Sequence, residues 1–209
     1  MKVNLFTISL SENDNPIRVE EFKFSIEKNK NTSLNYFEIN NVHRKTTYND
    51  FFKEFEKYPN DINIIANKDI FFTQESIDSI IDFFSNYKKD IKKLCLALSR
   101  WEYINENSSN FFNAKDSQDC WIFYGTVEYN NRSDVPLGVP GCDNRIASEL
   151  IYNYKYEVLN LGPSIKTYHY HPSGDSTRSY LNPDYSRNCY VEGPYEFLIP
   201  CKIEDYEKK

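Results

Sequence analysis

Residues 62–72 read INIIANKDIFF, and the interpretation of the whole chain starts from this stretch. The branched apolar residues from Ile62 to Ala66 are typical of a buried strand, which then ends abruptly in Asn-Lys-Asp. In an open α/β sheet, ligands bind just beyond the carboxyl ends of the strands. Asp69 would therefore be placed to hold a divalent cation against a nucleotide diphosphate. The simpler alternative is a strand-to-turn boundary in which Asn and Asp supply turn chemistry.

The first hundred residues alternate between strand and helix patterns around this stretch. Residues 94–98 read LCLAL, an apolar run typical of a strand buried on both faces. The other predicted strands are 3–9, 34–39 and 62–66, and the predicted helices are 17–30, 46–57 and 74–87. This alternation predicts an α/β fold with a mostly parallel central sheet and helices on both faces.

The second half of the chain is less regular. After Trp101 the pattern changes to short strands and loops punctuated by Pro and Gly. We predict strands at 117–123, 155–159 and 164–169, a helix at 144–152, and little periodicity after Pro172. Because no linker separates the halves, we predict one domain over 1–209, with a nucleotide-binding half at about 1–100 and an acceptor half with a tail at about 101–209.

Composition narrows the class of protein. The chain has 209 residues and a net charge of −6, which argues against a broad nucleic-acid surface. No apolar run approaches the ~18 residues of a membrane span, and the N-terminus lacks the pattern of a signal peptide. The five cysteines are widely spaced and odd in number, as expected of reduced thiols inside a cell. These features predict a cytoplasmic protein.

Two of the three histidines, His169 and His171, occupy one predicted strand. Residues two apart on a strand share a face, so both imidazoles would point to one site. Imidazole suits first-row divalent ions, which makes a metal site one interpretation. A polar strand end with exposed histidines is the other interpretation.

Two further acids lie at the ends of predicted elements. Asp143 directly precedes a predicted helix, where it would be either a helix N-cap or a general base at the mouth of the sheet. Asp119 follows Ser117 and Gln118 in a polar turn and has the same ambiguity. The sequence contains no Walker loop, nucleophile elbow or Gly-x-Gly-x-x-Gly motif, which removes the commonest nucleotide and hydrolase interpretations.

Five short motifs occur in a fixed order along the chain: ANKDIFF at 66–72, LALSRW at 96–101, SQDCWIF at 117–123, PGCDNR at 140–145 and IKTYHYH at 165–171. Together they resemble a family of small glycosyltransferase domains with the GT-A fold, found in bacteria and in large DNA viruses. The resemblance covers about residues 3 to 200. It implies a nucleotide-sugar donor, usually UDP-linked, bound with Mn²⁺ or Mg²⁺, and a glycan or other hydroxyl acceptor.

The resemblance also implies a role for each matching residue. Asn67, Lys68 and Asp69 stand at the place of the family's Asp-x-Asp motif, with Asn67 departing from it and Asp69 left as the clear carboxylate ligand. His171 matches a late metal ligand, with His169 as the second choice. The remaining matches are Thr7 and Arg44 for nucleobase and ribose, Asp143 for the base of an inverting reaction, and Asp119 for the sugar or acceptor pocket.

Two other functional classes stay open at the level of sequence. The missing first acid of the Asp-x-Asp motif is compatible with a catalytically idle module that binds a nucleotide or sugar. A nucleotidyltransferase-like enzyme would share the metal and the α/β architecture. The absence of a Gly-rich phosphate loop near Thr7 counts against this last class.

Overall fold

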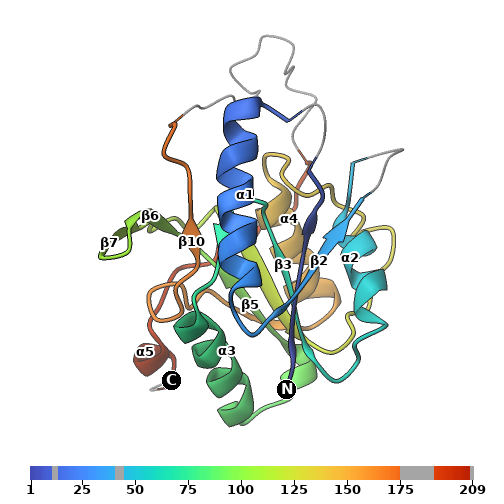
Figure 1. The fold of residues 1–209 in the computed structure, drawn as a ribbon. Coiled ribbons are helices and arrows are strands. Elements are labelled where there is room, and N and C mark those ends of the chain that lie inside the picture. The colour runs from blue at the N-terminus through green and yellow to red at the C-terminus, as the bar shows by residue number, and fades with distance from the viewer. Residues whose placement is uncertain (11–13, 41–44, 175–190, 208–209) are drawn as a thin grey trace.

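The computed structural model describes residues 1–10, 14–40, 45–174 and 191–207 (Figure 1). The strands are β1 (Val3–Ile8), β2 (Asn35–Ile39), β3 (Ile62–Ala66), β4 (Ile70–Phe71), β5 (Leu94–Leu98), β6 (Trp101–Asn105), β7 (Ser108–Phe111), β8 (Cys120–Tyr124), β9 (Glu157–Leu159) and β10 (Tyr168–His169). The helices are α1 (Pro16–Lys30), α2 (Tyr48–Phe55), α3 (Gln74–Asn86), α4 (Cys142–Ser148) and α5 (Ile203–Tyr206), with short turns η1 (Ile91–Lys93) and η2 (Glu149–Asn153).

The main sheet has the strand order β2-β1-β3-β8-β5-β9. Its strands run in one direction except β8, which lies antiparallel between β3 and β5. The α/β class predicted from the sequence is therefore confirmed, and the sheet is mixed. The pattern of apolar residues identified β8 as a buried strand, but it could not show the strand's direction.

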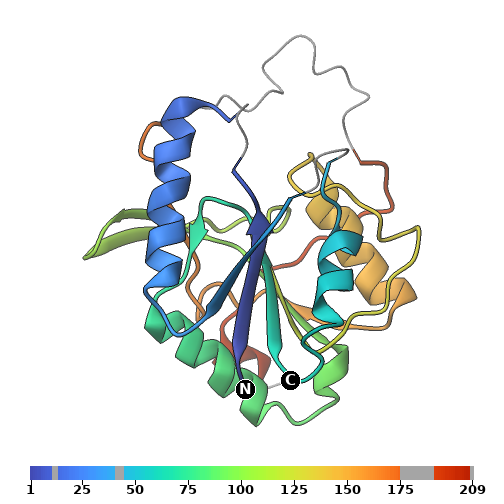
Figure 2. The ribbon, with the colours of Figure 1, turned by 45° about the vertical axis from the view of Figure 1, so that its right-hand side comes forward.

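The two faces of the main sheet carry separate hydrophobic cores because neighbouring residues of a strand point to opposite sides. On β3, Ile64 belongs to one core and Ile65 to the other. Helix α3 covers the first core, and helices α2 and α4 cover the second (Figure 2). The aromatic side chains of α2 that fill the second core are Tyr48, Phe51, Phe52 and Phe55. Helices lie on both faces, as predicted.

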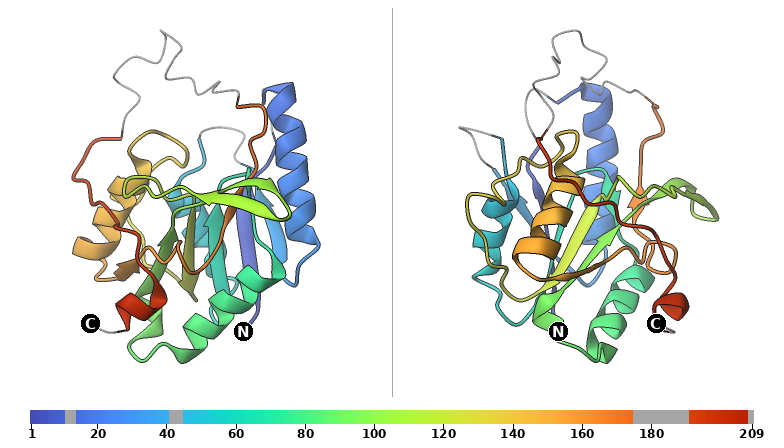
Figure 3. Two further views of the ribbon diagram at one scale, coloured as in Figure 1. Left: turned by 90° about the vertical axis from the view of Figure 1, so that its left-hand side faces the viewer. Right: turned by 180° about the vertical axis from the view of Figure 1, so that it is seen from behind.

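A second sheet, of order β4-β10-β6-β7, is built from the segments that follow the main strands. The β6–β7 hairpin projects away from the main sheet to one side (Figure 3, right). Strand β4 begins one turn after β3, where the Ile70 N–H donates to the carbonyl of Asn67 at 3.1 Å. The stretch 62–72 thus supplies one strand to each sheet, with Asn67, Lys68 and Asp69 at the junction.

Several boundaries in the second half differ from the sequence-based expectations. The helix expected at 144–152 begins earlier, at Cys142, and passes into the short π-helix η2. The strand expected at 164–169 is only Tyr168–His169, and the β6–β7 hairpin was not predicted as such. Short strands of this kind are formed by their partners across the sheet, so their own sequence gives a weak signal.

Among the described residues, no helix is long and apolar enough to cross a membrane. Three buried cysteines of that part of the chain (Cys95, Cys120 and Cys142) are free thiols. Cys189 lies outside the described residues.

Candidate functional site

The predicted site residues converge because three strand ends meet at one edge of the main sheet. Cys120 at the start of β8 pairs with Ala66 at the end of β3 and with Leu98 at the end of β5. The Asn67 N–H donates to the Asp119 carbonyl at 3.2 Å, and the Asp119 N–H donates to Leu98 at 3.1 Å. This is the carboxyl edge of the parallel strands, where α/β proteins bind their ligands.

A continuous set of polar contacts runs along this edge. We call it the ionic chain and define it by its members in order of contact: Glu21, Arg18, Asp69, His169, Glu102, Arg100, Asp119 and Asn67. The ionic chain connects helix α1, the β3–β4 junction, β10, β6 and the segments flanking β5 and β8. Buried charges are tolerated only when they are paired and hydrogen-bonded, and this arrangement meets that condition.

Asp69 has two cationic neighbours. Its Oδ2 accepts a hydrogen bond from the Arg18 guanidinium and lies 3.1 Å from His169 Nε2. Burial alone would raise the pKa of the Asp69 carboxyl, but His169 and Arg18 outweigh burial and hold that pKa well below its usual value. Asp69 is therefore ionised and ion-paired within the protein itself.

His169 is the histidine that contacts Asp69. Its ring is held between two acids, with Nδ1 2.7 Å from Glu102 and Nε2 3.1 Å from Asp69, and the residue is 4% exposed. Burial lowers the pKa of His169, but the hydrogen bonds to both acids outweigh burial and raise it to about 9. The ring of His171, the first choice from the sequence, lies 5.5 Å from that of His169 in an edge-to-face contact.

Arg100 joins the two acids at the other end of the ionic chain. Its Nε donates to Glu102 at 2.6 Å and its Nη1 donates to Asp119 at 2.9 Å. Asp119 also accepts a hydrogen bond from the side-chain amide of Asn67 at 3.1 Å. Asp119 is thus a paired carboxylate at the base of the site, and the amide of Asn67 is turned toward it.

Asp143 lies in the first turn of α4 and is more buried than exposed. The N-cap of α4 is Gly141 in the left-handed conformation, φ 84°, so the alternative that Asp143 is the N-cap is wrong. The Tyr48 hydroxyl donates to Asp143 Oδ1 at 3.4 Å. Burial, followed by the charge of Asp119, raises the pKa of Asp143 to about 7. A carboxyl that titrates near neutral pH is suited to proton transfer.

The residues expected to bind the nucleotide have different surroundings. Thr7, at the end of β1, is buried, and its hydroxyl has no hydrogen-bond partner within the part of the chain that the structure describes. Lys68 pairs with Asp14 at 2.5 Å and lies over the ring of Phe22. Arg44 lies outside the described residues.

The side chains at the expected metal site can be judged by the groups that they already contact. Over the described ranges, no group of three or more His, Cys, Asp or Glu residues is arranged to hold a metal ion. Asp69 is paired with Arg18 and His169, both ring nitrogens of His169 face carboxylates, and the Asn67 amide faces Asp119. In this arrangement Asn67, Asp69 and His169 do not fit as ligands of a divalent ion, because each is already committed to another residue.

Sequence reasoning missed four members of the ionic chain, namely Glu21, Arg18, Arg100 and Glu102. Arg18 reaches Asp69 from 51 residues away, and Glu102 and Arg100 lie on the segment after β5. Arg100 lies inside the motif LALSRW at 96–101, and this position was the one indication in the sequence that Arg100 could belong to the site. Nothing in the spacing of Arg18 or Glu102 pointed to a shared site.

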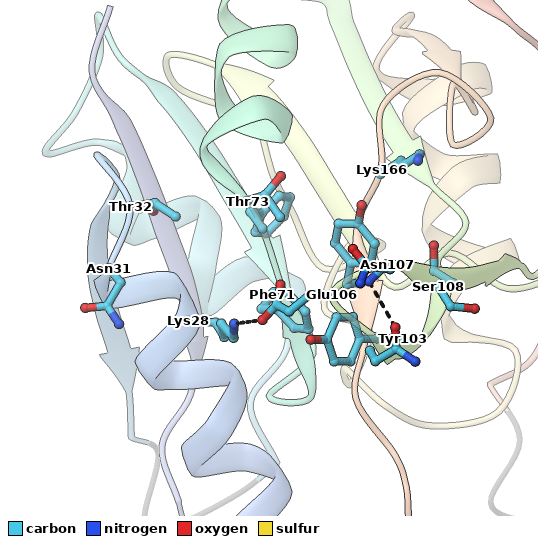
Figure 4. A pocket seen from close by; sticks show the side chains of 14 residues that line it. Lys28, Asn31, Thr32, Phe71, Thr73, Tyr103, Glu106, Asn107, Ser108 and Lys166 are labelled. Atoms are coloured by element: carbon cyan, nitrogen blue, oxygen red, sulfur yellow. Dashed lines mark hydrogen bonds and ion pairs between the residues drawn. The ribbon is translucent and has the colours of Figure 1, made fainter.

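A separate pocket of about 330 Å³ lies between the end of α1, β4 and the β6–β7 hairpin (Figure 4). Lys28 and Glu106 pair across it at 2.5 Å, and the rings of Phe71, Tyr103 and Tyr168 contribute to its wall. No member of the ionic chain lines this pocket. It is therefore distinct from the site at the edge of the main sheet.

Comparison of the chain with protein-family models, with curated proteins and with solved structures found no match. The resemblance to GT-A glycosyltransferases therefore stays a prediction from the five motifs. What the structure adds is the geometry of the sheet edge at which those motifs meet.

The pKa of His169 predicts a pH dependence of stability. A raised pKa means that protonated His169 stabilises the fold fully below pH 6.5, and that this contribution is lost as the pH rises toward 9. The full shift corresponds to roughly 3 kcal/mol. Urea denaturation of wild type between pH 6 and pH 9.5 should therefore show a loss of unfolding free energy that is much smaller in His169→Gln. His171→Gln is the control and should keep the wild-type loss. Equal losses in wild type and His169→Gln would contradict this assignment.

For Asp143 we predict that replacing the carboxyl with an amide stabilises the protein. Since its pKa is raised from 3.8 to about 7, ionisation of Asp143 destabilises the folded state increasingly between those pH values and fully above them. Asp143→Asn should therefore be more stable than wild type at pH 8, by roughly 4 kcal/mol at most, and this advantage should shrink toward pH 4. Thermal unfolding measures it, with the exposed Asp116→Asn as the matched control. A variant less stable than wild type at pH 8 would show that the Asp143 carboxylate is a stabilising group.

Proposed function

We propose that this protein is a glycosyltransferase of the GT-A type. It would transfer a sugar from a nucleotide-sugar donor, UDP-linked according to the resemblance, to a hydroxyl acceptor with inversion at the anomeric carbon. The observation that carries the proposal is the combination of groups at one sheet edge. A carboxyl with a pKa of about 7 lies there together with the cationic groups of the ionic chain.

The proposed reaction needs two kinds of group. As the acceptor oxygen attacks the anomeric carbon, its proton passes to the Asp143 carboxylate. The bond from the anomeric carbon to the diphosphate breaks, and its electron pair leaves with the diphosphate oxygen. The negative charge that develops there is stabilised by fixed positive groups near the leaving phosphate. Arg18 and Arg100 are the permanently charged candidates for that task, because guanidinium groups stay protonated at all working pH values.

Several other residues have supporting roles in the proposal. Asp119 raises the pKa of Asp143 through its charge and helps to line the sugar or acceptor pocket. Thr7 offers a buried hydroxyl near the end of β1, where the resemblance places the nucleobase and ribose of the nucleotide sugar. The resemblance also predicts Mn²⁺ or Mg²⁺ at Asp69, and that prediction is tested together with donor binding below.

A catalytically idle nucleotide- or sugar-binding module is the second candidate function. The specific observation in its favour is that Asp69, Asn67 and Asp119 are engaged with other residues of the protein. Binding of nucleotide sugars without any turnover, across a panel of hydroxyl acceptors, would favour this second candidate.

Activity depends on Asp143 if the proposal is correct. A panel of UDP-sugars with glycan and simple alcohol acceptors should give wild-type release of UDP and formation of a glycoside. Asp143→Asn should fold and lose about 100-fold or more in turnover, the usual contribution of a general base. Asp116→Asn should keep wild-type turnover, and the wild-type kcat/KM should rise through about pH 7 as Asp143 ionises. Full turnover by Asp143→Asn would show that another group is the base.

A further inference from the structure

Arg18 is a largely buried arginine at the junction of the two sheets. Its side chain is 12% exposed, it stands in the first turn of α1, and its guanidinium donates to both Glu21 and Asp69. These contacts carry the side chain from helix α1 to the β3–β4 junction. Arg18 therefore places a permanent positive charge where the Asp-x-Asp motif of the resembled family would place a metal ion.

Both acids that hold Arg18 have a second donor. Asp69 also contacts His169 Nε2 at 3.1 Å, and Glu21 also accepts a hydrogen bond from the Ser173 N–H at 2.9 Å. If Arg18 turned one or two N–H groups to a new anion, neither carboxylate would be left buried without a partner. The main free-energy cost of moving Arg18 from these carboxylates to a new anion is a buried carboxylate left unpaired. The second donors, His169 and the Ser173 N–H, lower that cost.

The chemistry of guanidinium matches the proposed donor. Its planar fork donates two parallel hydrogen bonds to phosphate as it does to carboxylate. A divalent ion such as Mg²⁺ instead requires several oxygen ligands in a regular geometry. At the place of the Asp-x-Asp motif, Asn67 to Asp69 provide one carboxylate, Asp69, already shared by two cations, together with an amide that donates to Asp119.

We propose that Arg18 is the resident cation of the site and binds the diphosphate of the nucleotide donor without a divalent metal ion. This inference rests on the proposed function, since it presupposes a nucleotide diphosphate at this edge. It names a binding residue that neither the five motifs nor the resemblance assigned.

Isothermal titration calorimetry with UDP and GDP tests the inference directly. Wild type should bind one of them with the same affinity, within about threefold, in EDTA and in Mn²⁺. Arg18→Gln should weaken binding at least tenfold, and Arg18→Lys should weaken it less because it keeps the charge. Lys23→Gln, an exposed position on the same helix, is the matched control and should bind as wild type does. Titration of Mn²⁺ alone into wild type should give no saturable binding.

The possible failures separate the two proposals. Loss of wild-type nucleotide binding in EDTA would overturn the role of Arg18 and restore the metal site, while the proposed function would stand. Wild-type affinity in Arg18→Gln, measured on protein shown to be folded by circular dichroism, would also overturn it. No binding of UDP, GDP or their sugar conjugates under any condition would refute the proposed function itself.

Discussion

The pairing of Cys120 with both Ala66 and Leu98 is the constraint on which the site depends. An antiparallel β8 begins where β3 and β5 end, so residues that precede one strand and follow the others share one edge. Asp119 is fixed between the two parallel strands by backbone hydrogen bonds on both sides. From that position its carboxylate meets Arg100, and its charge reaches Asp143.

Ion pairing determines which groups at this sheet edge are charged. Each member of the ionic chain is held by at least one group of opposite charge or by an amide, which offsets the cost of removing these charges from water. The result is a set of paired cationic groups beside acids whose pKa values are shifted in opposite directions. Asp69 and Glu102 are held ionised, whereas Asp143 titrates near neutral pH. Divergent environments for neighbouring carboxyls are typical of catalytic sites.

The sequence was sufficient to predict the elements that follow strong periodicities. Buried runs such as 62–66 and 94–98 form strands, and 74–86 forms a helix, because burial of their apolar faces agrees with their local pattern. Strand direction was beyond prediction for β8, since an apolar run looks the same whichever way it lies in the sheet. The β6–β7 hairpin was missed because its strands are short and half-exposed.

The candidate site was predictable in part for the same reason. Asp69, Asp119 and Asp143 were expected at the ends of strands or helices, and the structure brings these ends together at one edge of the main sheet. Their roles were not predictable, because the pKa of a carboxyl depends on partners distant in sequence. Arg18 contacts Asp69 across 51 residues, and His169 contacts it across 100. Side chains brought together by tertiary structure leave no local pattern to find.

The central claim is that the sheet edge holds a carboxyl tuned for proton transfer beside a second, ionised carboxylate. Carbon-detected NMR titration of the Asp143 side chain tests it most directly, in wild type and in Asp119→Asn. The account predicts an apparent pKa of about 7 for wild-type Asp143 and a lower value in Asp119→Asn, since the charge of Asp119 is removed. A wild-type value near the ordinary 3.8 that does not respond to the loss of Asp119 would contradict it.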